Sequence, residues 1–205
     1  MLKNILYAVL LGVGMAACLS QQDNPDDETA GEPEEFILPE TTEDATALSD
    51  STLFLVAEQR VGNTRIGMPI ARMRQQVSGG LRLTDTTLNL EGAPSTAYVL
   101  RPEKEAKGLL IEQSCDGECK VWRISVLSPK YKTAKDIRVG TTYGELQQVY
   151  KIRAVTFEEG NVVAQAPDAG MSFMLDHSSL PAEELSRLNA ATAPKNLPIE
   201  RILVY

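Results

Sequence analysis

"GMPIARMRQQV" runs from Gly67 to Val77, and "GTTYGELQQVY" runs from Gly140 to Tyr150. Each segment opens with a glycine and continues in the pattern of a short amphipathic helix. Glycine readily takes a positive φ angle, which suits a point where a strand turns abruptly into a helix. The sequence therefore indicates the same strand-to-helix transition twice, 73 positions apart.

The likeness between the two segments extends to a second motif. At an offset of 73, the corresponding pairs are Gly67 with Gly140, Ile70 with Tyr143, Met73 with Leu146 and Gln75 with Gln148. The tetrapeptides "RISV" (Arg123–Val126) and "RILV" (Arg201–Val204) lie 78 positions apart. These spacings predict a tandem repeat of a unit of about 75 residues, with halves at 51–133 and 134–205. Chance similarity between two amphipathic helices is the alternative.

Three short helices are expected. One covers about 69–77, where a proline suits the first helical turn and apolar residues follow three and four apart. Another covers about 142–150, where Thr142 and Glu145 form a capping-box pattern. The third covers about 181–189 and has two glutamates in its first turn, where the helix dipole favours them.

Strand patterns dominate the remainder of the chain after Ser51. They occupy 52–62, 80–92, 95–102, 107–114, 120–128, 152–160, 161–166, 171–176 and 199–205. Short turn signals separate them, so the strands should pair mainly as antiparallel hairpins. The fold class predicted is α+β, a mainly antiparallel sheet with two or three short helices packed on one face.

The charge of the chain is unevenly distributed. The formal net charge is −8, and residues 19–50 hold 11 Asp and Glu with no Lys or Arg. Residues 51–205 carry a formal charge of only +2, which gives no reason to expect a nucleic-acid partner. Residues 18–50 are predicted to be a disordered acidic tether that begins at Cys18, because they offer little apolar surface to bury. An unselected solubilising tail is the alternative.

The first residues, "MLKNILYAVLLGVGMAACLS", have one early cation, an apolar run and small residues before a cysteine. Residues 1–17 are predicted to be a signal peptide, since the apolar run is too short to span a bilayer. Met15-Ala16-Ala17-Cys18 resembles the lipobox of bacterial lipoproteins, with Met15 where leucine is usual. The resemblance implies acylation of Cys18, which would attach the chain to a membrane. It also implies a Gram-negative outer membrane, on the periplasmic side or at the cell surface. An uncleaved signal anchor is the alternative.

A second resemblance concerns the folded part. "NTRIGMPIARMRQQV" resembles the helix start of small barrel-assembly lipoproteins of the SmpA/OmlA type. These are similar in fold to the beta-lactamase inhibitor protein, a tandem repeat of α/β units. The likeness covers about a sixth of the chain. It implies a small layered α/β fold and transfers no catalytic residue.

The cysteines beyond Cys18 form a pair. "IEQSCDGECKVW" has the pattern of a strand, an Asp-Gly turn and a second strand, which places Cys115 opposite Cys119. In an oxidising compartment the expected outcome is a disulfide. Free thiols, or a metal or redox site, are the alternatives. A zinc site would need two more ligands, and the single histidine is His177.

Basic residues gather in "SPKYKTAKDIR". The candidate residues for binding an anion or a partner are Lys130, Tyr131, Lys132, Lys135 and Arg138. A solvated loop is the favoured alternative. A glycan or lipid headgroup would be the ligand of such a cluster.

No catalytic constellation is found in the sequence. His177 follows Asp176, but neither Ser178 nor Ser179 lies in a glycine-cradled turn of the kind a serine nucleophile needs. No metal signature, phosphate loop or cofactor motif occurs. The leading hypothesis is a non-catalytic envelope lipoprotein that binds a protein or an envelope polymer. An enzyme acting on a cell-wall ligand, or an inhibitor protein by fold analogy, is the alternative.

Overall fold

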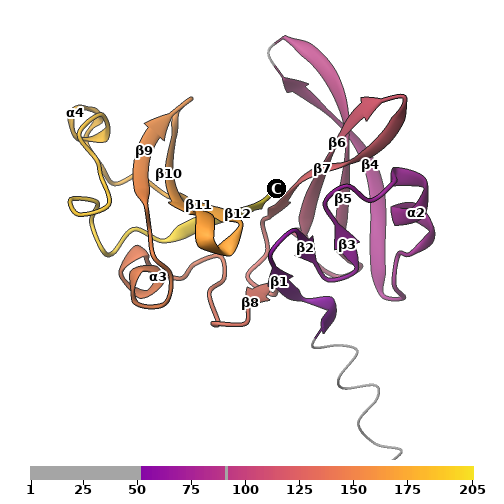
Figure 1. Ribbon diagram of the computed structural model, residues 1–205, viewed down its shortest axis with the longest axis horizontal. Coiled ribbons are helices and arrows are strands. Elements are labelled where there is room, and N and C mark those ends of the chain that lie inside the picture. Colours follow the sequence, from indigo (N-terminus) through magenta and orange to yellow (C-terminus); the bar gives the residue numbers. More distant parts are fainter. Residues whose placement is uncertain (1–51, 91) are drawn as a thin grey trace, which may run out of the picture. The chain divides into compact units, whose positions relative to one another are not determined.

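The computed structural model describes residues 52–90 and 92–205, all within one compact unit that ends at Tyr205. The predicted signal peptide, Cys18 and the acidic segment lie outside the described residues. An eight-stranded antiparallel sheet dominates, in the order β4-β5-β6-β7-β12-β11-β10-β9 (Figure 1). Its strands are β4 (Leu81–Leu90), β5 (Ala93–Pro102), β6 (Leu109–Asp116), β7 (Glu118–Val126), β9 (Ala154–Glu158), β10 (Asn161–Ala166), β11 (Met171–Leu175) and β12 (Ile199–Val204).

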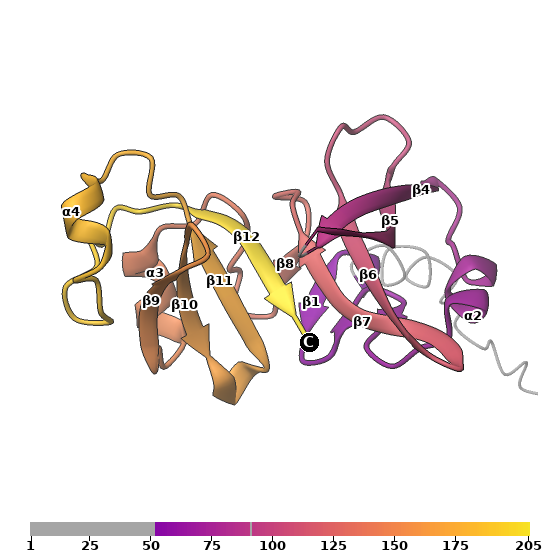
Figure 2. The same cartoon turned by 90° about the horizontal axis from the view of Figure 1, so that it is seen from above.

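The sheet consists of two antiparallel four-stranded runs. One run is β4 to β7 and the other is β9 to β12, and each follows the chain from one edge towards the centre. The last strands of the two runs, β7 and β12, pair with each other, so β12 joins the runs (Figure 2). The prediction of a sheet-dominated α+β fold is confirmed.

A smaller sheet has the order β3-β2-β1-β8. Its strands are β1 (Leu55–Ala57), β2 (Arg60–Val61), β3 (Thr64–Arg65) and β8 (Lys132–Thr133). The prediction of one continuous strand over 52–62 is wrong, because the chain reverses after Ala57 and places Gln59 at φ 53°. β1 and β2 pair across this reversal as an antiparallel hairpin.

The helices are α2 (Ile70–Gln75), α3 (Tyr143–Val149) and α4 (Ala182–Leu185), and a short 3-10 turn, η1, covers Pro167–Ala169. The capping box predicted for α3 is present, because Thr142 accepts from the Glu145 N–H and Glu145 accepts from the Thr142 N–H. The third helix is shorter than predicted. α4 ends at Leu185, its single buried residue, and one buried contact stabilises little more than a turn.

The two faces of the large sheet differ in their side chains. The strand registers place one set of apolar residues on the same face, which we call the core face: Ile111, Ile124, Val126, Phe173, Ile202 and Val204. These residues share one buried cluster with Ile70 and Met73 of α2 and Tyr143 and Leu146 of α3. Both helices therefore pack against the core face.

The two helix-opening glycines make the same backbone contacts. Gly67 has φ 76° and Gly140 has φ 92°. The Gly67 N–H donates to the Val121 carbonyl over 2.8 Å, and the Gly140 N–H donates to the Ile199 carbonyl over 2.8 Å. In return, the N–H of Val121 donates to Met68 and the N–H of Ile199 donates to Thr141. Each glycine thus ties its helix to the last strand of its own run.

Candidate functional site

The cations of the predicted 130–138 cluster are already partnered within the chain. Lys132 and Arg138 both contact Asp136, at 2.8 and 2.7 Å, and they lower the pKa of its carboxyl group. Lys130 lies 3.4 Å from Glu105, and Lys135 donates to the Val149 carbonyl over 2.6 Å. Each of the four cations therefore has a partner within the chain, and these exposed contacts contribute little to stability.

Tyr131, which the sequence analysis placed with these cations, does not lie on the surface. It is 1% exposed, and its ring packs edge-on against Phe54 at 5.1 Å between centroids. Burial raises the pKa of its phenol, and the charge of Glu105 adds to this, so the group stays neutral. Tyr131 is a core residue, and it cannot stack on a ligand at the surface.

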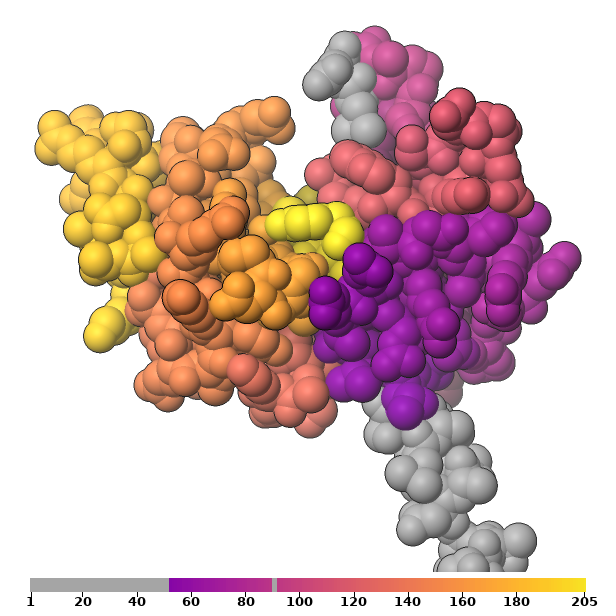
Figure 3. All heavy atoms as spheres, in the orientation of Figure 1, coloured from indigo at the N-terminus to yellow at the C-terminus, as the bar shows by residue number. Residues whose placement is uncertain are grey.

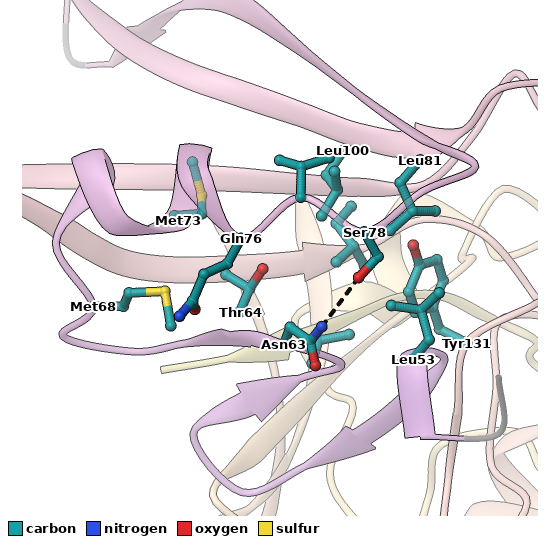
Figure 4. Close-up of a pocket in the computed structure, with 13 residues that line it drawn as sticks. Leu53, Asn63, Thr64, Met68, Met73, Gln76, Ser78, Leu81, Leu100 and Tyr131 are labelled. Carbon is teal, nitrogen blue, oxygen red and sulfur yellow. Dashed lines mark hydrogen bonds between the residues drawn. The ribbon is translucent and has the colours of Figure 1, made fainter. Parts of the chain in front are cut away.

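A small cavity lies beside Tyr131, between α2, the β2–β3 hairpin and the large sheet (Figure 4). Its volume is about 10 Å³, and its lining is mostly apolar, with Met73, Leu81 and Leu100 among the side chains. The Tyr131 hydroxyl has no hydrogen-bond partner among the described residues. A cavity of this volume holds about one water molecule at most, so it does not serve as a ligand pocket.

His177 lies in the loop that follows β11 and precedes α4. Its ring packs edge-on against Phe157, at 5.6 Å between centroids. The Asp176 carboxylate accepts from the Ser178 N–H, and this bond lowers the pKa of Asp176. Over residues 52–90 and 92–205, no group of His, Cys, Asp and Glu side chains could hold a metal ion.

Cys115 and Cys119 form the predicted disulfide. They are cross-strand partners at the tip of the β6–β7 hairpin, with the turn at Gly117 between them. The closed ring spans only a sequence separation of 4, so it constrains little of the unfolded chain. The bond therefore serves to fix the hairpin tip locally.

The second face of the large sheet, which we call the open face, carries no helix against it in the described part of the chain. Its central row consists of Ser172, Leu203, Ser125 and Leu110, paired in that order across β11, β12, β7 and β6. Figure 3 shows a hollow between the strands of the two runs, with the end of β12 at its base. Ser125 and Ser172 are buried in this face, although no helix covers it.

An ion pair and two aromatic residues mark the same face. Arg123 donates twice to the Glu112 carboxylate, over 2.9 and 2.6 Å, in a two-pronged pair. Trp122 is the extra residue of a β-bulge opposite Glu112 and Gln113, and Arg123 lies 4.7 Å from its ring centroid. Trp122 is 48% exposed and Tyr205 is 51% exposed. Large aromatic side chains that remain exposed beside arginine are typical of binding surfaces.

Three buried polar atoms of the open face lack partners. They are Ser125 Oγ, Thr156 Oγ1 and Arg201 Nε, and none has a hydrogen bond within the described residues. The pairings Thr156–Val163, Val163–Met174 and Met174–Arg201 place the last two atoms on one row of the face. All three atoms are closed off from solvent, so they are polar groups buried beneath the open face and not contacts that the face offers to a ligand.

Sequence reasoning missed both the open face and a group of arginines at another place. Arg60, Arg65 and Arg72 line a depression of about 610 Å³ beside the β2–β3 hairpin. The tetrapeptide "RISV" predicted the β7 strand. The open face was missed because it depends on the pairing of β7 with β12, and their "RISV" and "RILV" motifs lie 78 positions apart in the sequence. The symmetric segment "RVGNTR", Arg60–Arg65, is the signal from which the first two arginines could have been found.

Comparisons with known proteins bear on the fold. The chain is similar to the crystal structure of the uncharacterized protein yfeY from Escherichia coli, with 18% identity and a TM-score of 0.55. The match covers 73% of this chain and 97% of that one. No protein-family model matches the chain, and a search of curated proteins finds no significant match. Among the described residues, no helix is long and apolar enough to cross a bilayer.

Proposed function

We propose that the protein is a non-catalytic, lipid-anchored envelope protein that binds another protein through the open face of its large sheet. The observation that carries this proposal is the pair of exposed aromatic side chains on that face, Trp122 and Tyr205, with Arg123 beside Trp122. A bound protein would remove this apolar area from water.

The composition of the open face favours a protein as the partner. Trp122 and Tyr205 provide large rigid contact areas, and Tyr205 is held by a hydrogen bond of 2.5 Å between its hydroxyl and Ser172. Trp, Tyr and Arg are the residues that most often dominate the binding free energy of protein interfaces. An interface centred on β7 and β12 would use residues from both runs of the sheet at once.

Site-specific photo-crosslinking tests this proposal. A photoreactive residue replaces Trp122 in one variant and Phe157 in a control, since both side chains are exposed aromatics and Phe157 pairs with Val162 on the core-face side. The proposal expects a discrete protein adduct from position 122 and none from position 157. Equal adducts from positions 122 and 157, or only glycan adducts, would contradict the proposal.

The membrane anchor is a separate part of the proposal and concerns Cys18, which lies outside the described residues. Its support is the lipobox pattern Met15-Ala16-Ala17-Cys18. The attachment would place the chain in the outer membrane of a Gram-negative bacterium. Mass spectrometry of the mature amino terminus decides the matter, because acylation adds the mass of fatty acyl chains to Cys18. An intact, unacylated amino terminus on the exported chain would reject the anchor.

We further propose that the folded part arose by duplication of one unit, with the halves at 51–133 and 134–205. The support is the matching backbone contact of Gly67 with Val121 and of Gly140 with Ile199. Gly67 and Gly140 are 73 positions apart, and Val121 and Ile199 are 78 positions apart, which are the offsets that relate the sequence motifs. Two isolated bridges, Pro69 with Lys120 and Thr142 with Pro198, correspond at the same two offsets.

A further inference from the structure

We infer that Arg60, Arg65 and Arg72 form a binding site for a phosphate-bearing ligand. They line one depression of about 610 Å³, together with Asn63 and Gln76. Arg60 and Arg65 come from the β2–β3 hairpin, and Arg72 comes from α2. The site uses no residue of the open face, so a test of this inference does not depend on the function proposed above.

None of the three guanidinium groups has a partner in the described part of the chain. No ion pair or side-chain hydrogen bond involves Arg60, Arg65 or Arg72, whereas the cations of the 130–138 cluster are all engaged. Glu58 borders an adjoining shallow part of the depression, but its side chain lies against Gly170 and pairs with none of the arginines. The site therefore presents three uncompensated positive charges to solvent.

The position of two of these arginines costs stability. Arg60 and Arg65 are direct cross-strand partners in the β2–β3 hairpin. Like charges placed directly opposite each other destabilise an antiparallel pair. A second cross-strand pair, Arg82 with Arg101, differs because Arg101 donates to the Glu105 carbonyl. A bound anion between Arg60 and Arg65 would turn the repulsion into attraction.

The chemistry of the site favours phosphate over a single carboxylate. One carboxylate has two oxygens in one plane and one negative charge, which leaves most of the charge of three arginines uncompensated. A phosphate or diphosphate group carries about two or more charges at neutral pH and presents oxygens in several directions. Guanidinium forks that approach from a hairpin and from a helix can each bind different oxygens.

The ligand is confined to the outer depression. The small cavity of Figure 4 shares Asn63, Met68 and Gln76 with it, but that cavity measures only about 10 Å³. An acyl chain or a ring therefore cannot follow the phosphate inward. The phosphate group itself, whether free or on the headgroup of a lipid, is what the arginines recognise.

The test is a titration of the full-length chain, held in non-ionic detergent micelles, with inorganic pyrophosphate. Isothermal titration calorimetry should detect binding to the wild type. It should show a loss of about tenfold or more in affinity for each of R60Q, R65Q and R72Q, since each removes a charge-assisted hydrogen bond. R82Q is the matched control, because it removes one member of the other cross-strand arginine pair and should leave the affinity unchanged.

Thermal unfolding shows whether a variant that loses binding is still folded. R60Q and R65Q relieve a repulsion, so each should melt at or above the wild-type temperature. At one concentration, pyrophosphate should raise the melting temperature of the wild type more than that of the variants. Micelles doped with phosphatidylglycerol then identify the source of the phosphate: a lower apparent affinity for pyrophosphate points to a lipid headgroup, and an unchanged affinity points to a free phosphate compound. Absence of pyrophosphate binding to the wild type, or an equal loss in R82Q, would overturn the inference.

Discussion

The two runs of the large sheet share a framework and differ in how each helix begins. Gly67 and Gly140 make matching hydrogen bonds to the last strand of their own runs. α3 starts with a capping box at Thr142, whereas α2 starts at Pro69 with no side-chain cap. The backbone contact that sets the helix against the sheet is thus common to both runs, and the local chemistry around it is not. If this is correct, substitutions in the framework should act alike in both runs, and substitutions at the caps should not.

The largest expected effect comes from the buried helix residues. Leu146→Ala in α3 and Met73→Ala in α2 should each lower the free energy of unfolding by about 2–5 kcal/mol, because each leaves a cavity in the shared core. Urea unfolding of both variants measures the two losses. An exposed helix position, Gln75→Ala, should change little and serves as the control. A loss below about 1 kcal/mol in one variant alone would show that the two helices are not equivalent in the core.

The glycine positions should show a smaller and equal effect. Gly67→Ala and Gly140→Ala should each cost about 1–2 kcal/mol, because a residue with a Cβ is strained at a positive φ angle. A Cβ atom would meet nothing within 4 Å at either glycine, so the cost is one of backbone conformation alone. Gly79→Ala is the matched control, since that glycine has neither a positive φ nor a close neighbour. Clearly unequal losses at Gly67 and Gly140 would break the proposed equivalence of the two runs.

Local sequence signals located most strands and the capping box, because both depend on neighbouring residues. The reversal at Gln59 escaped detection because glutamine rarely takes a positive φ angle and gives no turn signal. The engagement of Lys132 and Arg138 with Asp136 could have been foreseen, since Lys132 and Asp136 are four residues apart in the same segment.

The sites on the folded chain depend on contacts that local patterns do not show. The open face exists because β7 pairs with β12, and its exposed tryptophan results from a bulge. The arginine depression needs the β2–β3 hairpin and α2 to lie side by side. Arg60, Arg65 and Arg72 are five and seven residues apart, and they form no charge run that would attract attention in the sequence.

Substitutions at the helix caps should affect the stability of the two runs differently. Thr142→Ala should lower the free energy of unfolding by about 1 kcal/mol, because it removes the side chain that accepts from the Glu145 N–H. α2 has no such side-chain bond to lose, so Pro69→Ala should cost less. Urea unfolding of both variants provides the comparison. If Pro69→Ala costs as much as Thr142→Ala, the cap is not what distinguishes the helices.

The pH dependence of the cap gives the smallest and most specific signal. The Thr142 hydroxyl and N–H donate to the Glu145 carboxylate and hold its pKa below its ordinary value. Because the folded-state pKa is depressed, the carboxylate contributes stability above its unfolded pKa of about 4.3, and the contribution is lost as the pH falls through the folded-state value. Glu145→Ala should therefore be less stable than the wild type at neutral pH, and the difference should shrink in acid. Urea unfolding of both chains from pH 7 to pH 3 measures this, with Glu184→Ala in α4 as an exposed first-turn control that makes no capping box. A difference that stays constant over that range would show that Glu145 acts through packing and not through its charge.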